Sequence, residues 1–335
     1  MSLNDLSDIE WEQIACPVCG CPDWRRVRTM TNLQYKTSAE FQLVRCSNCR
    51  HVYVNPRPAL DCIGRFYPDD YSPHTEPQSG THLEEKQEGA PWYLSRPVRA
   101  IPGLRGLYYW LKETCAEVVP KVDGATPRAL ELGCAGGRFL ETLRGKGWQA
   151  EGLEPAERPV AAARGRGFRV HHGPFVPGIY EPGSFDAVFA WMGLEHLHDP
   201  CGALREIHRI LKPQGWLVFS VPNWGCWEPR VLGRYWCLLD PPLHLHQFTP
   251  RISRGILTEA GFRQIRVIHQ RNAFNLVWSA GLWLREKSPQ ARLAQRLLDF
   301  PQNPSVRGQL ALAPIAKVLA WMRQSGRLTV TARKL

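Results

Sequence analysis

Short apolar runs alternate with amphipathic stretches through the second half of the chain, and this pattern predicts strands alternating with helices. One apolar run ends at Leu132, and a glycine turn and an amphipathic helix follow it directly. Another helix is expected over about residues 201–211, because Lys212-Pro213-Gln214-Gly215 ends its pattern. Further expected strands span residues 149–153, 184–191, 216–221, 263–270 and 327–333, and another ends at His171 and His172. This alternation favours an α/β fold with a doubly wound sheet.

The glycine turn after Leu132 predicts a nucleotide pocket, because glycines at the carboxyl end of a strand let the backbone approach a ligand closely. A dinucleotide fingerprint would need glycine where Ala135 and Arg138 stand, and a P-loop would need a Gly-Lys-Ser/Thr ending that the turn lacks. NAD and ATP are therefore disfavoured. Glu131 inside the first strand and Glu154 at the end of the next favour an adenosine ligand without phosphate, since a carboxylate can accept hydrogen bonds from both ribose hydroxyls. S-adenosylmethionine is such a ligand.

The order of these motifs resembles that of the class I S-adenosylmethionine-dependent methyltransferases. Their first motif is matched by Glu131, Gly133, Ala135 and Gly137, with Ala135 in place of the middle glycine, and their ribose-binding acid by Glu154. The resemblance continues through residues 184–197, 240–250 and 260–262, so it covers most of the chain. It implies a Rossmann-like, seven-stranded doubly wound sheet whose last pair is antiparallel, with S-adenosylmethionine as cofactor.

Four cysteines near the amino terminus predict a structural zinc site. Cys16 and Cys19 form one C-x-x-C pair, Cys46 and Cys49 form another, and 26 residues separate the pairs. Cys21 lies close enough in sequence to compete with Cys19, although the spacing favours Cys19. A catalytic zinc is disfavoured because four thiolates leave no open ligand position. The segment between the pairs predicts a small β domain that needs the metal, because its own core is small.

This amino-terminal module resembles the zinc-knuckle domain of sugar C-methyltransferases, and the whole chain also resembles ubiquinone-biosynthesis-type methyltransferases. The resemblance rests on the cysteine pairs, the turn at residues 51–58 and the aromatic, acidic segment at residues 66–72. It implies that the module shapes the acceptor pocket, where Tyr67 and Tyr71 are either active-site phenols or packing residues at the domain junction. We expect a zinc-knuckle domain over residues 1–72, a polar linker over 73–91, and a methyltransferase domain over 92–335 with a helical insertion at about 271–325.

The predicted catalytic residues follow strand ends, where open α/β sheets bind their ligands. Methyl transfer to a protic acceptor requires removal of a proton, and His196 beside Glu195 is the leading base, since an imidazole titrates near neutral pH. His196 could instead begin a helix and bond only to backbone. His244 is the second candidate, and His246 could share a metal with it or pack against the backbone.

Composition indicates a folded enzyme, with 335 residues, 44% hydrophobic and 22% charged. An odd number of cysteines, eleven, and an acidic start without an apolar segment favour a reduced, cytoplasmic setting. The net charge of +11 permits an anionic partner, but the arginines are scattered, so a nucleic-acid groove is disfavoured.

The expected function is transfer of a methyl group from S-adenosylmethionine to a carbon or oxygen of a small-molecule acceptor of sugar, lipid or secondary-metabolite type. RNA methylation and a non-catalytic binding protein on the same fold are the alternatives. Apolar stretches at residues 274–284 and 309–322 are too short to cross a bilayer. They predict either a helical cap over the pocket or peripheral membrane contact.

Overall fold

The computed structural model describes residues 8–34, 39–67, 114, 117–122, 126–302 and 304–335. At its centre lies a sheet of seven strands, which are β6 (Arg128–Leu132), β7 (Gln149–Glu154), β8 (Arg169–His172), β9 (Phe185–Trp191), β10 (Leu211–Pro222), β12 (Phe262–His269) and β13 (Arg327–Lys334). Their order is β12-β13-β10-β9-β6-β7-β8. The strands β10, β9, β6, β7 and β8 are parallel, and β13 is antiparallel to both of its neighbours. The predicted α/β class and the antiparallel end of the sheet are confirmed.

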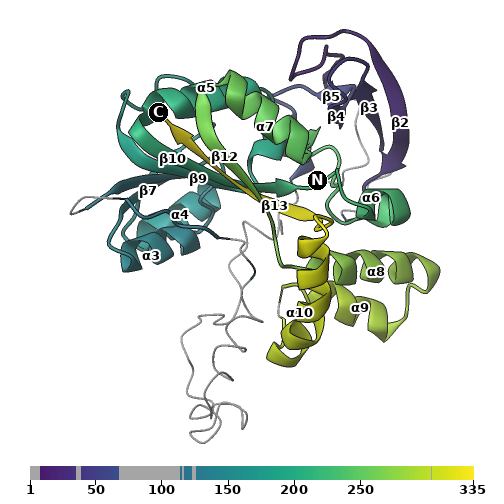
Figure 1. Cartoon of the computed structure of the whole chain (residues 1–335). Coiled ribbons are helices and arrows are strands. Elements are labelled where there is room, and N and C mark those ends of the chain that lie inside the picture. The colour runs from purple at the N-terminus through teal and green to yellow at the C-terminus, as the bar shows by residue number, and fades with distance from the viewer. Residues whose placement is uncertain (1–7, 35–38, 68–113, 115–116, 123–125, 303) are drawn as a thin grey trace, which may run out of the picture.

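Helices cover both faces of this sheet. Figure 1 shows α3 (Arg138–Gly145) and α4 (Glu157–Gly165) on one face, with α5 (Pro200–Ile210) and α7 (Pro250–Glu259) on the other. The starts of α5 and α7 are fixed locally, because Asp199 and Thr249 accept hydrogen bonds from backbone amides of the first turn and a proline follows each of them. The strands β6, β7 and β9 are each followed by a helix, α3, α4 and α5, that packs against the sheet.

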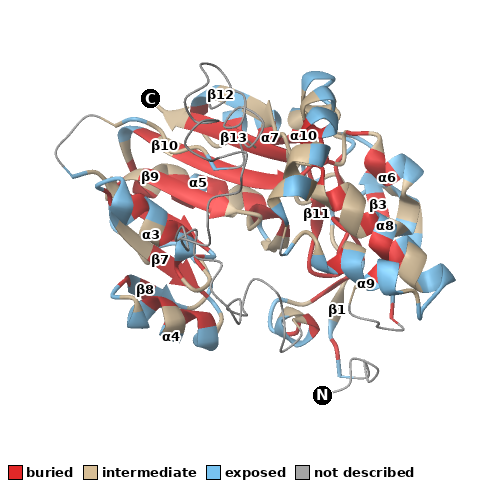
Figure 2. Cartoon of the chain, turned by 90° about the horizontal axis from the view of Figure 1, so that it is seen from below, coloured by how far each residue is buried: buried red, intermediate tan, exposed pale blue. Residues whose placement is uncertain are grey.

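The core lies between the sheet and its helices, and the strands are the most deeply buried part of the chain (Figure 2). Phe185, Phe219 and Phe248 have no exposed surface beneath α5 and α7. On the opposite face Phe139 packs edge-on against Phe189, with ring centroids 5.1 Å apart. Burial of this apolar surface on both faces makes the sheet a firm platform for residues at its carboxyl edge.

The sheet of the amino-terminal module includes one strand from a distant part of the chain. Its elements are β1 (Trp11–Glu12), β2 (Trp24–Thr31), β3 (Glu40–Cys46), β4 (Val52–Val54), β5 (Arg57–Pro58) and the 3-10 helix η1 (Ile63–Phe66). The strands β2, β3 and β4 form a sheet that β11 (His246–Gln247) completes by antiparallel pairing with β4. The module is thus joined to the larger sheet's domain by backbone hydrogen bonds as well as by side chains.

Three helices separate β12 from β13, within the residues predicted as a helical insertion. They are α8 (Phe274–Lys287), α9 (Arg292–Asp299) and α10 (Val306–Trp321). Shorter elements, α6 (Glu228–Val231) and η5 (Gly233–Tyr235), precede β11. Among the described residues, no helix is both long and apolar enough to span a bilayer. The predicted linker over residues 73–91 lies outside the described residues, and the division into domains stays a prediction.

Candidate functional site

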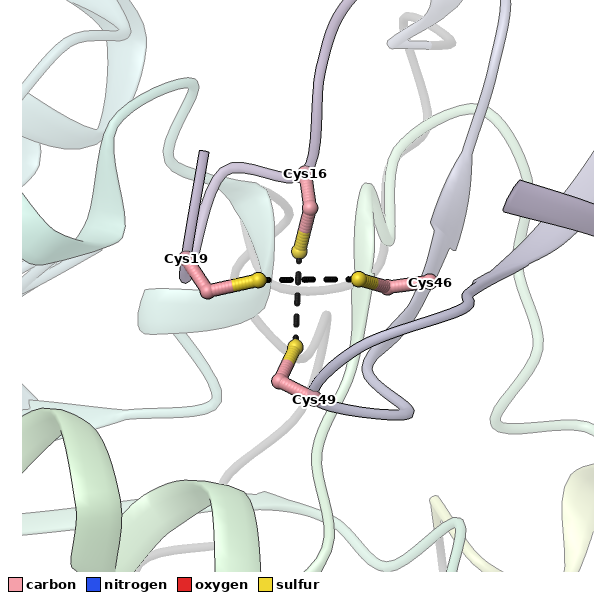
Figure 3. A group of neighbouring side chains, drawn as sticks. All are labelled: Cys16, Cys19, Cys46 and Cys49. Carbon is pink, nitrogen blue, oxygen red and sulfur yellow. Dashed lines mark hydrogen bonds between the residues drawn. The ribbon is translucent and has the colours of Figure 1, made fainter. Parts of the chain in front are cut away.

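The four predicted cysteines converge on one point (Figure 3). Cys16 and Cys19 come from the loop before β2, Cys46 ends β3, and Cys49 lies in the next turn. The Sγ atoms of Cys16 and Cys49 are 3.5 Å apart, as are those of Cys19 and Cys46. Two sulfurs bound tetrahedrally to one zinc ion at about 2.3 Å lie about 3.8 Å apart, so the arrangement fits zinc closely.

Cys21 does not join this group. Its thiol instead points to the backbone carbonyl of Asp23, with an Sγ–O distance of 3.7 Å. Burial raises the pKa of the Cys49 thiol to about 12 and raises that of Cys16 further. Buried thiols with raised pKa values become metal ligands only when a cation compensates the thiolate charge. The sulfur positions group Cys19, and not Cys21, with Cys16, Cys46 and Cys49.

The two cysteine turns share one backbone conformation. Gly20 follows the first pair with a φ of +70°, and Arg50 follows the second with a φ of +69°. This left-handed region costs an L-amino acid about 1–2 kcal/mol, whereas glycine enters it freely. Arg50 is thus a strained residue at a position that favours glycine.

The glycine turn predicted to bind the nucleotide has a left-handed backbone at every second residue. The φ angles are +70° at Gly133, +44° at Ala135 and +85° at Gly137, which caps α3. A side chain on Gly137 would also meet the Cβ of Ala163 at 3.1 Å, so close packing of α3 on α4 requires glycine there. Ala135 is the one non-glycine residue of the three, so an interaction must stabilise its left-handed conformation.

The side chain of Glu154 stabilises this conformation of Ala135. Glu154 ends β7, is 2% exposed, and its Oε2 accepts a hydrogen bond of 3.0 Å from the amide of Ala135. Its Oε1 accepts a second, also of 3.0 Å, from the amide of Ala156. Hydrogen bonds to a carboxylate are about twice as strong as neutral ones, so they hold Ala135 in its strained conformation. The carboxylate consequently lies against the turn, where its remaining lone pairs can accept hydroxyls of a bound ligand.

Glu131 adds a second buried carboxyl group beside this turn. It is 3% exposed within β6, and burial, followed by the charges of Glu117 and Glu154, raises its pKa well above the usual value. No described residue donates a hydrogen bond to its Oε2. A ligand bearing hydroxyl and amino groups would fit the two carboxyls and the open turn, because buried polar oxygens are ordinarily hydrogen-bonded.

The predicted catalytic residues meet at the carboxyl end of β9. Glu195 and His196 lie in the 3-10 helix η4 (Leu194–His196), which follows β9 after a short turn. His244, which lies just before β11, packs edge-on against His196 with ring centroids 4.8 Å apart. Tyr67 reaches the same place from the amino-terminal module, and its hydroxyl is 3.2 Å from His196 Nδ1. The other predicted phenol, Tyr71, lies outside the described residues.

Burial sets the protonation states in this cluster. Glu195 has no exposed surface, and desolvation raises its pKa to about 8, although its own amide and Arg327 oppose the rise. Apart from this amide, no described residue has a hydrogen bond to either carboxylate oxygen. Burial lowers the pKa of His244 to about 4, and its Nδ1 donates to the carbonyl of Leu238 at 2.9 Å. At neutral pH Glu195 is therefore mostly protonated and His244 is a neutral imidazole.

Asp240 belongs to the same neighbourhood, and sequence reasoning assigned it no role. It has a φ of +35°, and burial raises its pKa to about 7, against the effect of a 2.8 Å hydrogen bond from Asn32. Because Asn32 is distant in sequence, no local pattern could have paired these two residues. His246 does not join His244 at a common ligand: its Nε2 donates instead to the carbonyl of Leu197 at 2.8 Å.

The central segment of the chain is similar to known methyltransferases. Residues 105–267 match the model of a methyltransferase domain family. Two similar proteins are ubiquinone biosynthesis O-methyltransferases, from Bordetella pertussis (32% identity over 136 residues, 38% of this chain and 53% of the relative) and from Pseudomonas aeruginosa (32% over 133 residues, 37% and 57%). The chain spans about half the length of these curated relatives.

Solved structures of methyltransferases also align with the chain. A methyltransferase from Thermotoga maritima, described as a possible histamine N-methyltransferase, aligns with a TM-score of 0.43 at 17% identity, covering 68% of this chain and 89% of its own. A second, from Mesorhizobium loti, aligns with a TM-score of 0.42 at 20% identity, covering 70% of this chain and 99% of its own.

Proposed function

We propose that this chain, which carries a class I S-adenosylmethionine-dependent methyltransferase domain, transfers the methyl group of S-adenosylmethionine to a hydroxyl of a small-molecule acceptor. The observation that carries the proposal is the meeting of Glu195, His196, His244 and Tyr67 at the sheet edge where β9 ends. These groups can accept, donate and relay a proton. The ubiquinone-biosynthesis relatives are O-methyltransferases, which supports oxygen as the methylated atom.

S-adenosylmethionine supplies an already activated methyl group, so the chain must bind it, align the acceptor and remove a proton. We assign the ribose hydroxyls to Glu154 and the methionine portion to the turn from Gly133 through Ala135 to Gly137. The buried Oε2 of Glu131, which lacks a partner among the described residues, supports a polar ligand group beside this turn. The methyl group of Ala135 takes up space beside the turn that a glycine would leave open to the ligand.

We assign proton acceptance to His196. In the proposed step the acceptor oxygen forms a bond to the methyl carbon, the carbon–sulfur bond breaks with its electron pair on sulfur, and the hydroxyl proton passes to the imidazole. His196 is half-buried, whereas burial lowers the pKa of His244 to about 4 and makes it a weak base at neutral pH. Glu195, whose pKa burial raises to about 8, lies beside His196 in its protonated form and gives up no proton in this step.

Tyr67 and His244 would then orient His196. A phenol accepting from Nδ1–H leaves Nε2 to receive the proton, and the 3.2 Å distance between Tyr67 Oη and Nδ1 supports this arrangement. The neutral ring of His244 packs edge-on against the imidazole of His196. Fixing the imidazole in this way contributes to catalysis because the reacting atoms must be aligned within a fraction of an ångström.

We further propose that Cys16, Cys19, Cys46 and Cys49 hold one structural zinc ion. Their sulfur separations support tetrahedral coordination, and four protein ligands leave no position for a substrate. The ion would hold together a module whose own sheet has few strands and a small core.

The first test is methyl transfer from radiolabelled S-adenosylmethionine to a panel of catechols, hydroxylated quinols, nucleotide sugars, lipid extracts and RNA. We expect transfer to a small hydroxylated compound and a loss of kcat of about 10²- to 10⁴-fold in His196→Asn, with unchanged cofactor affinity. His208→Asn is the matched control, because that half-buried histidine contacts Phe262 and lies outside the site. Absence of calorimetric binding at millimolar S-adenosylmethionine would overturn the assignment as a methyltransferase. Transfer of the label to RNA would show that the acceptor is RNA and not a small molecule.

A further inference from the structure

A pair of buried histidines joins the cysteine module to the turn that bears His196. His51 lies two residues after Cys49 and has no exposed surface, and His246 in β11 is 1% exposed. The Nε2 of His51 and the Nδ1 of His246 are 3.2 Å apart. The rings are nearly parallel, with centroids 5.4 Å apart. The two imidazoles thus meet in the interface between the module and the sheet's domain.

Hydrogen-bond chemistry fixes the direction of this contact. The Nε2 of His246 is 2.8 Å from the carbonyl oxygen of Leu197, which can only accept, so Nε2 carries the proton. The Nδ1 of His246 is then a lone-pair acceptor, because burial lowers the pKa of this imidazole well below the usual value. His51 must therefore donate from its own Nε2.

The connection continues to the cysteines at one end and to the catalytic turn at the other. The backbone amide of His51 donates to Cys49 Sγ at 3.5 Å. Leu197 directly follows His196. A continuous series of hydrogen bonds and covalent bonds therefore runs from a cysteine of the proposed metal site to the proposed base.

A second set of hydrogen bonds joins the module to the turn that follows His196. Arg57 Nη1 donates to the carbonyl of His198 at 2.7 Å, and the side chain of Arg57 also bonds to Glu12 at 2.6 Å. His198 Nε2 in return donates to the carbonyl of Pro58 at 3.0 Å. Residues 197 and 198 are thus fastened to the module on two sides, which leaves the preceding residue little freedom to move.

We propose that His246 and His51 are positioning residues that couple the cysteine module to the catalytic turn, so that an intact module sets the placement of His196. This inference rests on the proposed function only in giving His196 a catalytic role. Two apolar side chains could fill the same volume without the cost of burying imidazoles. The directional bond to Leu197 is what the histidines add, and displacement of a catalytic group by about 1 Å can reduce kcat by about 100-fold.

Two isosteric variants separate this role from simple packing. His246→Gln places an amide N–H near the Nε2 position and keeps the bond to Leu197, whereas His246→Asn keeps only an acceptor near the Nδ1 position, facing His51. We expect both proteins to retain zinc and calorimetric affinity for S-adenosylmethionine. Against the acceptor found in the panel, kcat should fall by about 10- to 100-fold in the Asn variant, with KM for S-adenosylmethionine unchanged. It should recover in part in the Gln variant, which keeps the bond to Leu197 but loses the acceptor for His51. Equal kcat in Asn and wild type, or loss of zinc from both variants, would overturn the proposal.

A measurement on the wild type needs neither a variant nor an acceptor. With ¹⁵N-labelled histidine, nuclear magnetic resonance should find the proton of His246 on Nε2 and a scalar coupling across the N–H···N bond from His51. A proton on Nδ1 of His246, or no coupling in the zinc-loaded protein, would refute the proposed hydrogen bond from His51 to His246 even if methyl transfer is confirmed. Conversely, an observed coupling without any methyl transfer would contradict the proposed methyltransferase function and leave the hydrogen bond between the two histidines established.

Discussion

Replacing Glu154 with glutamine tests the placement of the cofactor most directly. The carboxylate accepts from the amides of Ala135 and Ala156 at 3.0 Å each, and it is 2% exposed. A glutamine side chain can accept only one of these bonds, and its NH₂ group then faces the other amide. Hydrogen bonds to a charged group contribute about 1.5–3 kcal/mol each, so the free energy of unfolding should fall by about 2–3 kcal/mol.

The same substitution should weaken cofactor binding. Loss of the charged acceptor for the ribose hydroxyls, together with release of Ala135 from its φ of +44°, predicts a Kd for S-adenosylmethionine raised about 100-fold, equivalent to about 2.8 kcal/mol. Calorimetric titration measures this change, and thermal unfolding measures the loss of stability.

Glu151→Gln is the matched control for this prediction. Glu151 lies on the same strand, but its carboxylate pairs with Arg128 at 2.9 Å near the surface, and such pairs contribute about 1 kcal/mol or less. Its cofactor affinity should equal that of the wild type. An affinity of Glu154→Gln within about threefold of wild type would show that the ribose binds elsewhere.

Three further predictions concern the metal site, the strained knuckle and the buried acid. Elemental analysis should give about one zinc per chain in the wild type and in Cys21→Ser, but little in Cys49→Ser; zinc retained by Cys49→Ser would exclude the four-thiolate site. Arg50→Gly should bind zinc and be more stable by about 0.5 kcal/mol, because relief of its left-handed strain exceeds the added chain entropy; a lower unfolding temperature would contradict this. Glu195 has a pKa raised to about 8 from a usual value of 4.5, so its contribution to stability is fully present below pH 4.5 and is lost as pH rises through 8. Glu195→Gln should therefore gain stability relative to wild type between pH 5 and pH 8 in denaturant titrations, whereas parallel curves would show that Glu195 is not buried in its protonated form.

Sequence reasoning went furthest where chemistry depends on local spacing. The turn from Gly133 to Gly137 could be predicted because a strand, its glycines and the next helix are contiguous, and the structure gives each alternate residue a left-handed backbone. The cysteine pairs were visible for the same reason, since a C-x-x-C turn presents two thiolates by itself. Helix α9 was not predicted individually, because its strongly polar sequence lacks the apolar stretch that marked α8 and α10.

Long-range relations were beyond the reach of pattern alone. The choice between Cys19 and Cys21 depends on where β3 delivers Cys46, with which Cys19 is in contact at 3.5 Å. The bond from Asn32 to Asp240 and the pairing of β11 with β4 join residues far apart in the chain. Neither has a local signature, because hydrogen-bond partners across a domain junction are selected by shape and not by sequence period.

The sequence by itself thus determined the α/β class, the glycine turn beside Glu154, and the two cysteine pairs, because each depends on residues a few positions apart. Tertiary structure alone decided that His244 meets His196 while His246 turns to His51, although only one residue separates His244 from His246. The physical reason is burial: His244 and His246 are 6% and 1% exposed, and their buried ring nitrogens bond to whichever donors and acceptors the packed elements bring within about 3 Å.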